Sequence, residues 1–250
     1  MADEPGVGGR PSRAAVEARR PPATPTIDAV IPARDEALTV ADVVGAARGC
    51  AHVREVIVVD DGSGDDTAVL AAAAGAKVIS RHPGGSKARA MEAGVAASDA
   101  DAILFLDADL TGLTSAHLDE ICAPWLVGRA VMSIGTFDYG RLVNWLVLRL
   151  PPTTGERIVP RWVFDAVPSH KRDGYTIEVM LNGVIAEGRL PTTARVMQGV
   201  FHRTKRQKFG WLHGSALTWR MFCQLIGLPI RGVVRWRTYW FYLRNLTIEG

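Results

Sequence analysis

The sequence predicts an α/β fold in which a mostly parallel β-sheet carries helices on both faces. Short apolar runs alternate with segments of helical periodicity between residues 26 and 137, which is the pattern of βαβ units. The apolar runs do not alternate with polar residues, as expected of strands that are covered on both sides. With 250 residues, 48% of them hydrophobic and 22% charged, the chain can form one large globular domain.

Each element of the first half has its own signal. An apolar run predicts a strand at 26–33, helical spacing predicts a helix at 36–50, and a second apolar run predicts a strand at 54–64. The next elements are expected at 65–75 (helix, with Gly75 as its C-terminal cap), 76–80 (strand), 86–98 (helix) and 102–110 (strand). A basic, glycine-rich loop at 81–87 connects the strand at 76–80 to the helix at 86–98.

The second half is less regular, and its elements follow from shorter signals. Helices are expected at 117–128 despite Pro124, at 141–150, at 161–167 and at 176–188, and strands are expected at 130–137 and 193–202. Residues 209–250 are aromatic and basic and contain helical stretches. We therefore expect a C-terminal helical region after the α/β part.

Composition bounds the setting of the protein. Residues 1–25 are rich in Pro, Gly, Ala and Arg and are expected to form a disordered tail. The three cysteines are far apart and show no metal-binding spacing, which is typical of a reduced cytoplasmic protein. No window of about 18 uncharged apolar residues predicts a membrane span. A net charge of +3 gives little support for a nucleic-acid partner, and none is expected.

Pairs of aspartates follow two of the predicted strands. Asp60 and Asp61 end one strand, and Asp107 and Asp109 end another. Ligands of open α/β sheets bind at the carboxyl ends of the strands. If the chain stays extended, Asp107 and Asp109 point the same way, and two such carboxylates are suited to a hard divalent cation such as Mg²⁺ or Mn²⁺. The alternative is an Asp-rich turn that only caps the next helix.

Three segments carry a resemblance to a known family. "VIPARDEALTVADVV", "VIVVDDGSGDDT" and "ILFLDADL", in this order, resemble the nucleotide-binding half of family 2-type glycosyltransferases, which have a GT-A, Rossmann-type fold. The resemblance covers about residues 27–137. It implies a nucleotide-diphosphate sugar as the donor, with a UDP-sugar favoured and GDP-mannose as the alternative.

The same resemblance assigns residues to the donor and to Mg²⁺ or Mn²⁺. It implies donor-binding roles for Pro32, Ala33, Glu36, Asp60, Asp61, Ser63, Lys87, Asp107 and Ala108, and a metal-binding pair of Asp107 and Asp109. Considered one at a time, several of these residues could have a purely structural role. Glu36 could complement a helix dipole, Asp60 and Asp61 could form a turn, and Lys87 could be a solvated surface residue.

The second half resembles two branches of this family. Segments 123–128, 155–168, 174–181 and 195–203 resemble glucosyl-3-phosphoglycerate synthases, which implies that His202 is a metal ligand and that Tyr175 and Glu178 line the sugar and acceptor pocket. The acceptor motif of that branch is altered here, because Val143 replaces a threonine after Gly140 and Arg141.

The other branch is the polyprenyl- and dolichol-phosphate sugar synthases. The residues that echo its acceptor site are Arg141, Asn144, Gly155, Arg157 and Arg203. A lipid-phosphate acceptor would suit the basic segment 202–210 and the aromatic segment 209–250, which could lie at the inner face of a membrane or form a homodimer contact.

We therefore expect a metal-dependent glycosyltransferase domain at 26–208, with a nucleotide-sugar half at 26–137, an acceptor half at 138–208 and an extension at 209–250. The acceptor is expected to carry a phosphate. The resemblance implies that Asp109 holds the catalytic cation and that Glu178 is either a general base or a positioning group. Two alternatives remain: a nucleotide-sugar-binding protein without turnover, and a sugar-phosphate nucleotidyltransferase, which is disfavoured because "PARDEALTV" lacks the glycine-rich loop of that class.

Overall fold

The computed structural model describes residues 20–82, 86–137, 154–169, 176–202, 240, 244 and 246–249. The strands are β1 (Ile27–Ala33), β2 (Val53–Asp60), β3 (Lys77–Ser80), β4 (Ala102–Phe105), β5 (Leu110–Thr111), β6 (Met132–Phe137), β7 (Arg157–Pro160), β8 (Thr192–Met197), β9 (Phe201–His202) and β10 (Leu246–Glu249). The helices are α2 (Val40–Gly49), α3 (Thr67–Ala73), α4 (Lys87–Ala96), α5 (Ser115–Leu126), α7 (Arg161–Asp165) and α8 (Thr176–Glu187).

Eight of the described strands form one sheet in the order β10-β8-β6-β7-β4-β1-β2-β3. The pairs of β1 with β2 and β4, of β2 with β3, and of β8 with β6 and β10 are parallel. Strand β7 is antiparallel to both of its neighbours, β4 and β6. The carboxyl ends of the parallel strands therefore meet the amino end of β7 at one edge of the sheet.

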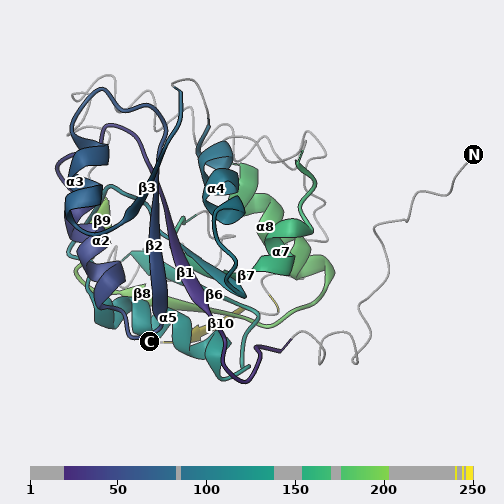
Figure 1. Ribbon diagram of the computed structural model, residues 1–250. Coiled ribbons are helices and arrows are strands. Elements are labelled where there is room, and N and C mark those ends of the chain that lie inside the picture. Colours follow the sequence, from purple (N-terminus) through teal and green to yellow (C-terminus); the bar gives the residue numbers. More distant parts are fainter. Residues whose placement is uncertain are drawn as a thin grey trace, which may run out of the picture.

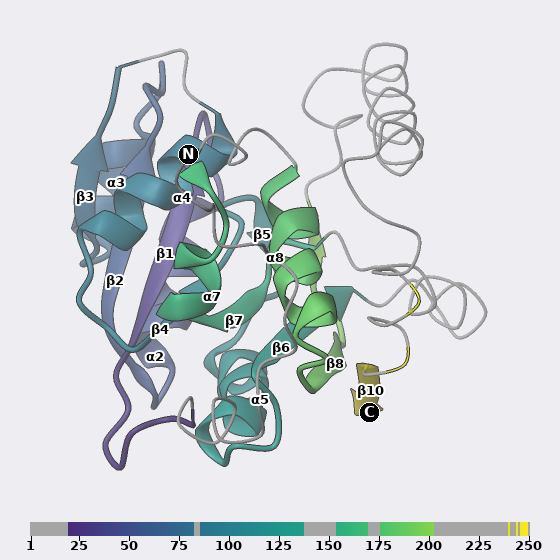
Figure 2. The same cartoon turned by 90° about the vertical axis from the view of Figure 1, so that its right-hand side faces the viewer.

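Helices cover both faces of this sheet, as the sequence predicts (Figures 1 and 2). Helices α2, α3 and α5 bury their apolar residues in one core cluster, which includes Val44, Ala71 and Ile121. Helices α4, α7 and α8 bury theirs in a second cluster on the other face, which includes Met91 and Phe164. The apolar strands contribute to both clusters in turn, so their lack of polar alternation is explained by burial on both sides.

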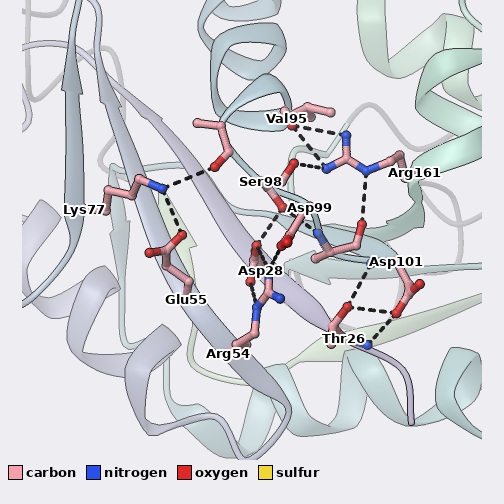
Figure 3. Close-up of polar contacts among 12 residues, drawn as sticks. Thr26, Asp28, Arg54, Glu55, Lys77, Val95, Ser98, Asp99, Asp101 and Arg161 are labelled. Atoms are coloured by element: carbon pink, nitrogen blue, oxygen red, sulfur yellow. Dashed lines mark hydrogen bonds and ion pairs between the residues drawn. The ribbon is translucent and has the colours of Figure 1, made fainter. Parts of the chain in front are cut away.

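A polar network ties the sheet together away from the carboxyl edge (Figure 3). The fully buried carboxylate of Asp28 accepts hydrogen bonds from Arg54 Nε at 3.0 Å and from Ser98 Oγ at 2.6 Å. The guanidinium of Arg161 donates to the carbonyls of Val95 at 3.2 Å and Ala100 at 3.1 Å. These bonds satisfy polar groups that would otherwise be costly to bury between α4, β1 and α7.

Two predicted strands are shorter than expected, because turns interrupt them. The strand predicted at 102–110 ends at Phe105, and the chain turns before β5 begins at Leu110. The strand predicted at 193–202 ends at Met197, and Gly199 turns the chain with a φ of 75° before β9. The two turns meet closely, since a Cβ on Gly112 would lie 2.2 Å from the carbonyl oxygen of Gly199. Glycine at this point lets β5 and β9 pair antiparallel.

Two strands are absent from the sequence-based prediction. Strand β7 has only four residues and runs straight into α7, so its apolar run is too short to show a period. Strand β10 lies in the segment expected to be helical, and it pairs parallel with β8 at the edge of the sheet. The last residues of the 209–250 extension thus belong to the sheet.

Several predicted elements lie outside the described residues. These are the tail before residue 20, the helix at 141–150 and most of the segment 209–250, including the surface expected to face a membrane or a second copy. Among the helices that are described, none is long and apolar enough to cross a membrane.

Candidate active site

The loops that follow β1 and β2 are joined by side-chain hydrogen bonds. The backbone N–H of Asp35 donates to Ser63 Oγ at 3.0 Å, and that of Glu36 donates to Thr67 Oγ1 at 2.8 Å. In return, the backbone N–H of Gly64 donates to Asp35 Oδ1 at 2.8 Å. Asp35 has a φ of 56°, which its short polar side chain tolerates. These bonds join two loops that both carry residues predicted to bind the donor, among them Glu36 and Ser63.

Asp60 and Asp61 are both buried at the end of β2. The backbone N–H of Asp61 donates to the carbonyl of Ala33 at 2.9 Å, and its carboxylate pairs with Arg81 Nη1 at 3.0 Å. Asp60 turns toward Ser63 and accepts from that residue's backbone N–H at 3.2 Å. Asp60 therefore braces the turn, while Asp61 lies against Ala33 with a cation beside it.

The acids after β4 are placed by a turn, and not by an extended chain as the sequence suggested. Strand β4 ends at Phe105, and the carbonyl of Ala108 accepts a hydrogen bond from Thr39 Oγ1 at 2.7 Å. Asp107 lies 2.6 Å from Lys87 Nζ, whereas Asp109 lies 3.1 Å from His202 Nδ1. The two carboxylates are thus held by different partners.

The pairing of β5 with β9 positions His202. Leu110 is the register partner of His202, so the histidine stands next to Asp109. Its imidazole ring packs against Phe137, with ring centroids 4.1 Å apart. Burial opposes a charge on the ring, but the hydrogen bond to Asp109 and the charge of Glu156 outweigh it and raise the pKa of His202 to about 9.

Glu156 completes this group, and the sequence analysis missed it. One ligand atom each from Asp107, Glu156 and His202 lie within 4.8 Å of one another. Glu156 enters the site because β7 is antiparallel, so the residues just before β7 reach the edge where β4 ends. Burial, followed by the charge of Asp107, raises the pKa of Glu156 to about 7. The only signal in the sequence is an acid followed by one arginine and the short apolar run "IVP".

These residues fit a divalent cation. Two carboxylates and an imidazole form a donor set that suits Mg²⁺ or Mn²⁺. Glu156 is fully buried, and within the described part of the chain its Oε1 has no hydrogen-bond partner, although its other oxygen is bound by Thr154. A buried carboxylate oxygen with no partner is costly, and a cation at this place would satisfy it.

Lys87 lies between the metal-binding group and Glu178. Its Nζ is 2.6 Å from Asp107 Oδ1 and 2.7 Å from Glu178 Oε1. Glu178 is almost completely buried in the first turn of α8. The sequence predicts that the lysine reaches the donor and that Glu178 faces the sugar and acceptor. The structure places Lys87 in contact with both Asp107 and Glu178.

Arg157 and Gly155 were both predicted to contact an acceptor. The guanidinium of Arg157 is fully buried, and it donates from Nε to the carbonyl of Thr154 at 3.1 Å and from Nη1 to Asn182 Oδ1 at 2.9 Å. Gly155 packs against the carboxylate of Asp107. In the described structure both residues hold the segment that carries Glu156, and their contact with an acceptor stays a prediction.

The remaining predicted acceptor residues lie outside the described part of the chain. They are Gly140, Arg141, Asn144, Tyr175 and Arg203. These residues fall in the ranges 138–153, 170–175 and 203–239, which the structure does not describe. The described part of the site therefore comprises the loops predicted to bind the nucleotide, the group of Asp107, Glu156 and His202, and the pair formed by Lys87 and Glu178.

Comparison with known proteins agrees with this geometry. The model of glycosyl transferase family 2 matches residues 28–180, which is more than half of the chain. Glucosyl-3-phosphoglycerate synthase of Mycolicibacterium paratuberculosis is 35% identical over 146 residues, which are 54% of this chain and 44% of that protein. The corresponding enzyme of Mycolicibacterium smegmatis is 34% identical over 126 residues, and 42% of it is covered. The chain thus spans less than half the length of these relatives.

Solved structures show the same fold with ligands. The glucosyl-3-phosphoglycerate synthase of Mycobacterium tuberculosis in complex with Mn²⁺, UDP-glucose and phosphoglyceric acid has a TM-score of 0.61 and 26% identity, over 78% of both chains. The same enzyme with Mg²⁺ and UDP has the same TM-score and identity, over 76% of this chain and 75% of that one. The region matched by the family model, residues 28–180, includes nearly all of β1, all of β2 and β4, and most of the residues that form the site. The chain belongs to glycosyl transferase family 2.

Proposed function

We propose that this protein transfers a sugar from a nucleotide-diphosphate sugar to a small acceptor that carries a phosphate, and that transfer depends on Mg²⁺ or Mn²⁺. The observation that carries the proposal is the grouping of Asp107, Glu156 and His202 within 4.8 Å. This group stands at the carboxyl edge of the sheet, beside the loops expected to bind a nucleotide. A cation there would stabilise the diphosphate as it leaves.

The donor is proposed to be UDP-glucose. The related structures hold UDP-glucose or UDP, and those nucleotides lie in proteins of the same fold. In this chain the buried Asp61 and the Arg81 beside it would face the base or ribose. A carboxylate accepts N–H and O–H groups, so it suits both the imide of a uracil base and a ribose hydroxyl.

Glu178 is proposed to orient the substrate. Its Oε1 is held 2.7 Å from Lys87 Nζ and its side chain is buried, so the carboxylate has a fixed position that suits an orienting group. Asp109, which the sequence predicts to be a metal ligand, lies 3.1 Å from His202 Nδ1, beside the group of Asp107, Glu156 and His202. It would serve catalysis at the metal site, as a ligand or by holding the imidazole of His202.

The acceptor is proposed to be 3-phosphoglycerate or a compound of the same chemistry. Support comes from the relatives, whose names and complexes include phosphoglycerate. One feature of the sequence favours a second acceptor, a polyprenyl phosphate: four cations, Arg203, Lys205, Arg206 and Lys208, follow directly after His202. A lipid acceptor would agree with the proposed peripheral membrane contact of segment 209–250.

A transfer assay with the full chain tests these proposals. UDP-glucose and GDP-mannose are each offered with 3-phosphoglycerate or a short polyprenyl phosphate, in Mn²⁺ and in EDTA. We expect Mn²⁺-dependent transfer from UDP-glucose to 3-phosphoglycerate. Transfer only to the lipid phosphate would replace the acceptor, while donor binding without transfer to any acceptor would favour a nucleotide-sugar-binding protein. Vesicle sedimentation and ultracentrifugation test the predicted membrane contact and homodimer.

A further inference from the structure

The ammonium of Lys87 occupies a position between two carboxylates that serve different parts of the site. Its Nζ lies 2.6 Å from Asp107 Oδ1 and 2.7 Å from Glu178 Oε1. The lysine side chain is 22% exposed and that of Glu178 is 2% exposed, so water screens these contacts weakly. Burial opposes the charge on the amine, but the two carboxylates outweigh it and hold the pKa of Lys87 above its usual value. The lysine is therefore a fixed cation.

Asp107 cannot serve two cations without a cost. Its carboxylate belongs to the group formed with Glu156 and His202, and it also holds the ammonium of Lys87. A divalent cation on the same carboxylate would stand close to that ammonium in a partly buried place, where repulsion between like charges is strong. Lys87 thus opposes the metal in the ligand-free protein.

We propose that Lys87 is the resident counter-cation of Asp107 in the ligand-free protein, and that the divalent metal binds tightly only when a diphosphate draws Lys87 away from Asp107. This inference rests on the proposed function, because it takes the diphosphate of the donor as the competing anion. An ammonium with three N–H donors is well suited to phosphate oxygens. Glu178 keeps the amine in place during the exchange, since its Oε1 lies 2.7 Å from Lys87 Nζ and does not depend on the contact with Asp107.

The exchange couples the two ligands. If the diphosphate removes a charge that repels the metal, each ligand raises the affinity for the other by the same factor. The protein would then bind little metal on its own and would take up metal and nucleotide together. A lysine that merely contacts phosphate would weaken nucleotide binding when removed and would leave the affinity for metal alone unchanged. The affinity for metal in the absence of nucleotide therefore separates the two roles.

The test is a titration of the full chain with Mn²⁺ alone, in which free Mn²⁺ is followed by electron paramagnetic resonance. We expect Lys87→Gln to bind Mn²⁺ at least about tenfold more tightly than the unmodified protein, as removal of a nearby positive charge requires. UDP binding by the same variant is expected to weaken. Lys77→Gln is the matched control, because Lys77 pairs with Glu55 at 3.3 Å on a half-exposed surface of β2 and β3. It should leave both affinities unchanged.

A second variant separates charge from shape. Lys87→Arg keeps the positive charge, so its affinity for Mn²⁺ alone should stay at the level of the unmodified protein. Mn²⁺ affinity that is unchanged or lower in Lys87→Gln, or equally raised in Lys87→Arg, would overturn the proposal. If the glutamine variant does not fold by circular dichroism, Lys87→Met replaces it. The Mn²⁺ arm needs neither sugar nor acceptor, so a failure to find sugar transfer would count against the proposed function and not against this inference.

Discussion

Gly155 lies directly against the carboxylate of Asp107. A Cβ built on Gly155 would stand 2.4 Å from Asp107 Oδ1 and 2.7 Å from its Oδ2, which no side chain can do without displacing that carboxylate. The residue before Glu156 must therefore be a glycine if Asp107 is to stay beside Glu156 and His202. The sequence predicts an acceptor contact for Gly155. The structure shows a different requirement, since a side chain at this position would displace the carboxylate of Asp107.

We predict that Gly155→Ala weakens Mn²⁺ binding by at least about tenfold, because Asp107 must move away from the other two ligands. Titration calorimetry with Mn²⁺ in the presence of saturating UDP measures the loss, because the protein is proposed to bind little metal on its own. Gly45→Ala is the control, since a Cβ on Gly45 would meet nothing within 4 Å inside α2. It should leave Mn²⁺ binding unchanged and raise stability by about 0.5–1 kcal/mol. Equal Mn²⁺ affinities in the two variants would refute the steric role of Gly155.

Glu156 and Asp109 can be compared as supports of the metal site. Glu156→Gln keeps the shape of the side chain and removes the charge that faces Asp107 and His202, whereas Asp109→Asn disturbs the partner of His202 Nδ1. We expect each change to weaken Mn²⁺ binding by about 10- to 100-fold. Full Mn²⁺ affinity in a folded Glu156→Gln variant would remove Glu156 from the site.

The pKa of His202, raised to about 9, predicts opposite pH effects with and without metal. In EDTA the imidazolium stabilises the folded state. Because the folded pKa exceeds the usual value of about 6.5, this stability is fully present below about pH 6.5 and is lost as pH rises through about 9. A metal needs the neutral ring, so the stabilisation by Mn²⁺ should grow over the same range.

Thermal unfolding from pH 6 to pH 9 in EDTA and in Mn²⁺ measures both trends. His202→Gln should flatten both curves. A melting temperature that falls by the same amount with pH in the variant and in the unmodified protein would show that other groups cause the change.

The polar network in Figure 3 offers a contrast in stability between a buried and an exposed ion pair. Arg54 donates to the fully buried Asp28, and its removal would leave that carboxylate without its cation. We expect Arg54→Ala to lower the free energy of unfolding by about 2 kcal/mol. A larger loss is not expected, because the arginine side chain itself is 43% exposed. Lys77→Ala breaks the half-exposed pair with Glu55 and should cost less than about 0.5 kcal/mol. Urea unfolding compares them, and equal costs would contradict the argument.

The part of the fold in which strands and helices alternate could be predicted from the sequence, because each signal there is local. Apolar runs place β1 and β2, and helical spacing places α2 and α4. The acids at 60 and 61 and at 107 and 109 point to the carboxyl edge because they follow such runs. Because β2 and β4 are both parallel to β1, their carboxyl ends place these acids at the same edge of the sheet.

The rest of the site depends on contacts between distant segments. Glu156 reaches Asp107 only because β7 is antiparallel, and a run of four residues carries no sign of its direction. His202 reaches Asp109 through the pairing of β5 with β9, which needs close contact between Gly112 and Gly199. The sequence suggested that Arg157 is a cation that contacts the acceptor. Its burial could not be predicted, because it depends on the distant helix α8, which supplies Asn182.

The site is proposed to hold a nucleotide diphosphate through a divalent cation bound by Asp107 and its neighbours. Titration of UDP into the metal-free full chain, and then into the chain with saturating Mn²⁺, tests it most directly. We predict that Mn²⁺ tightens UDP binding by at least about tenfold and that Asp107→Ala abolishes this gain while the fold is kept. The same UDP affinity in EDTA and in Mn²⁺ would contradict the claim.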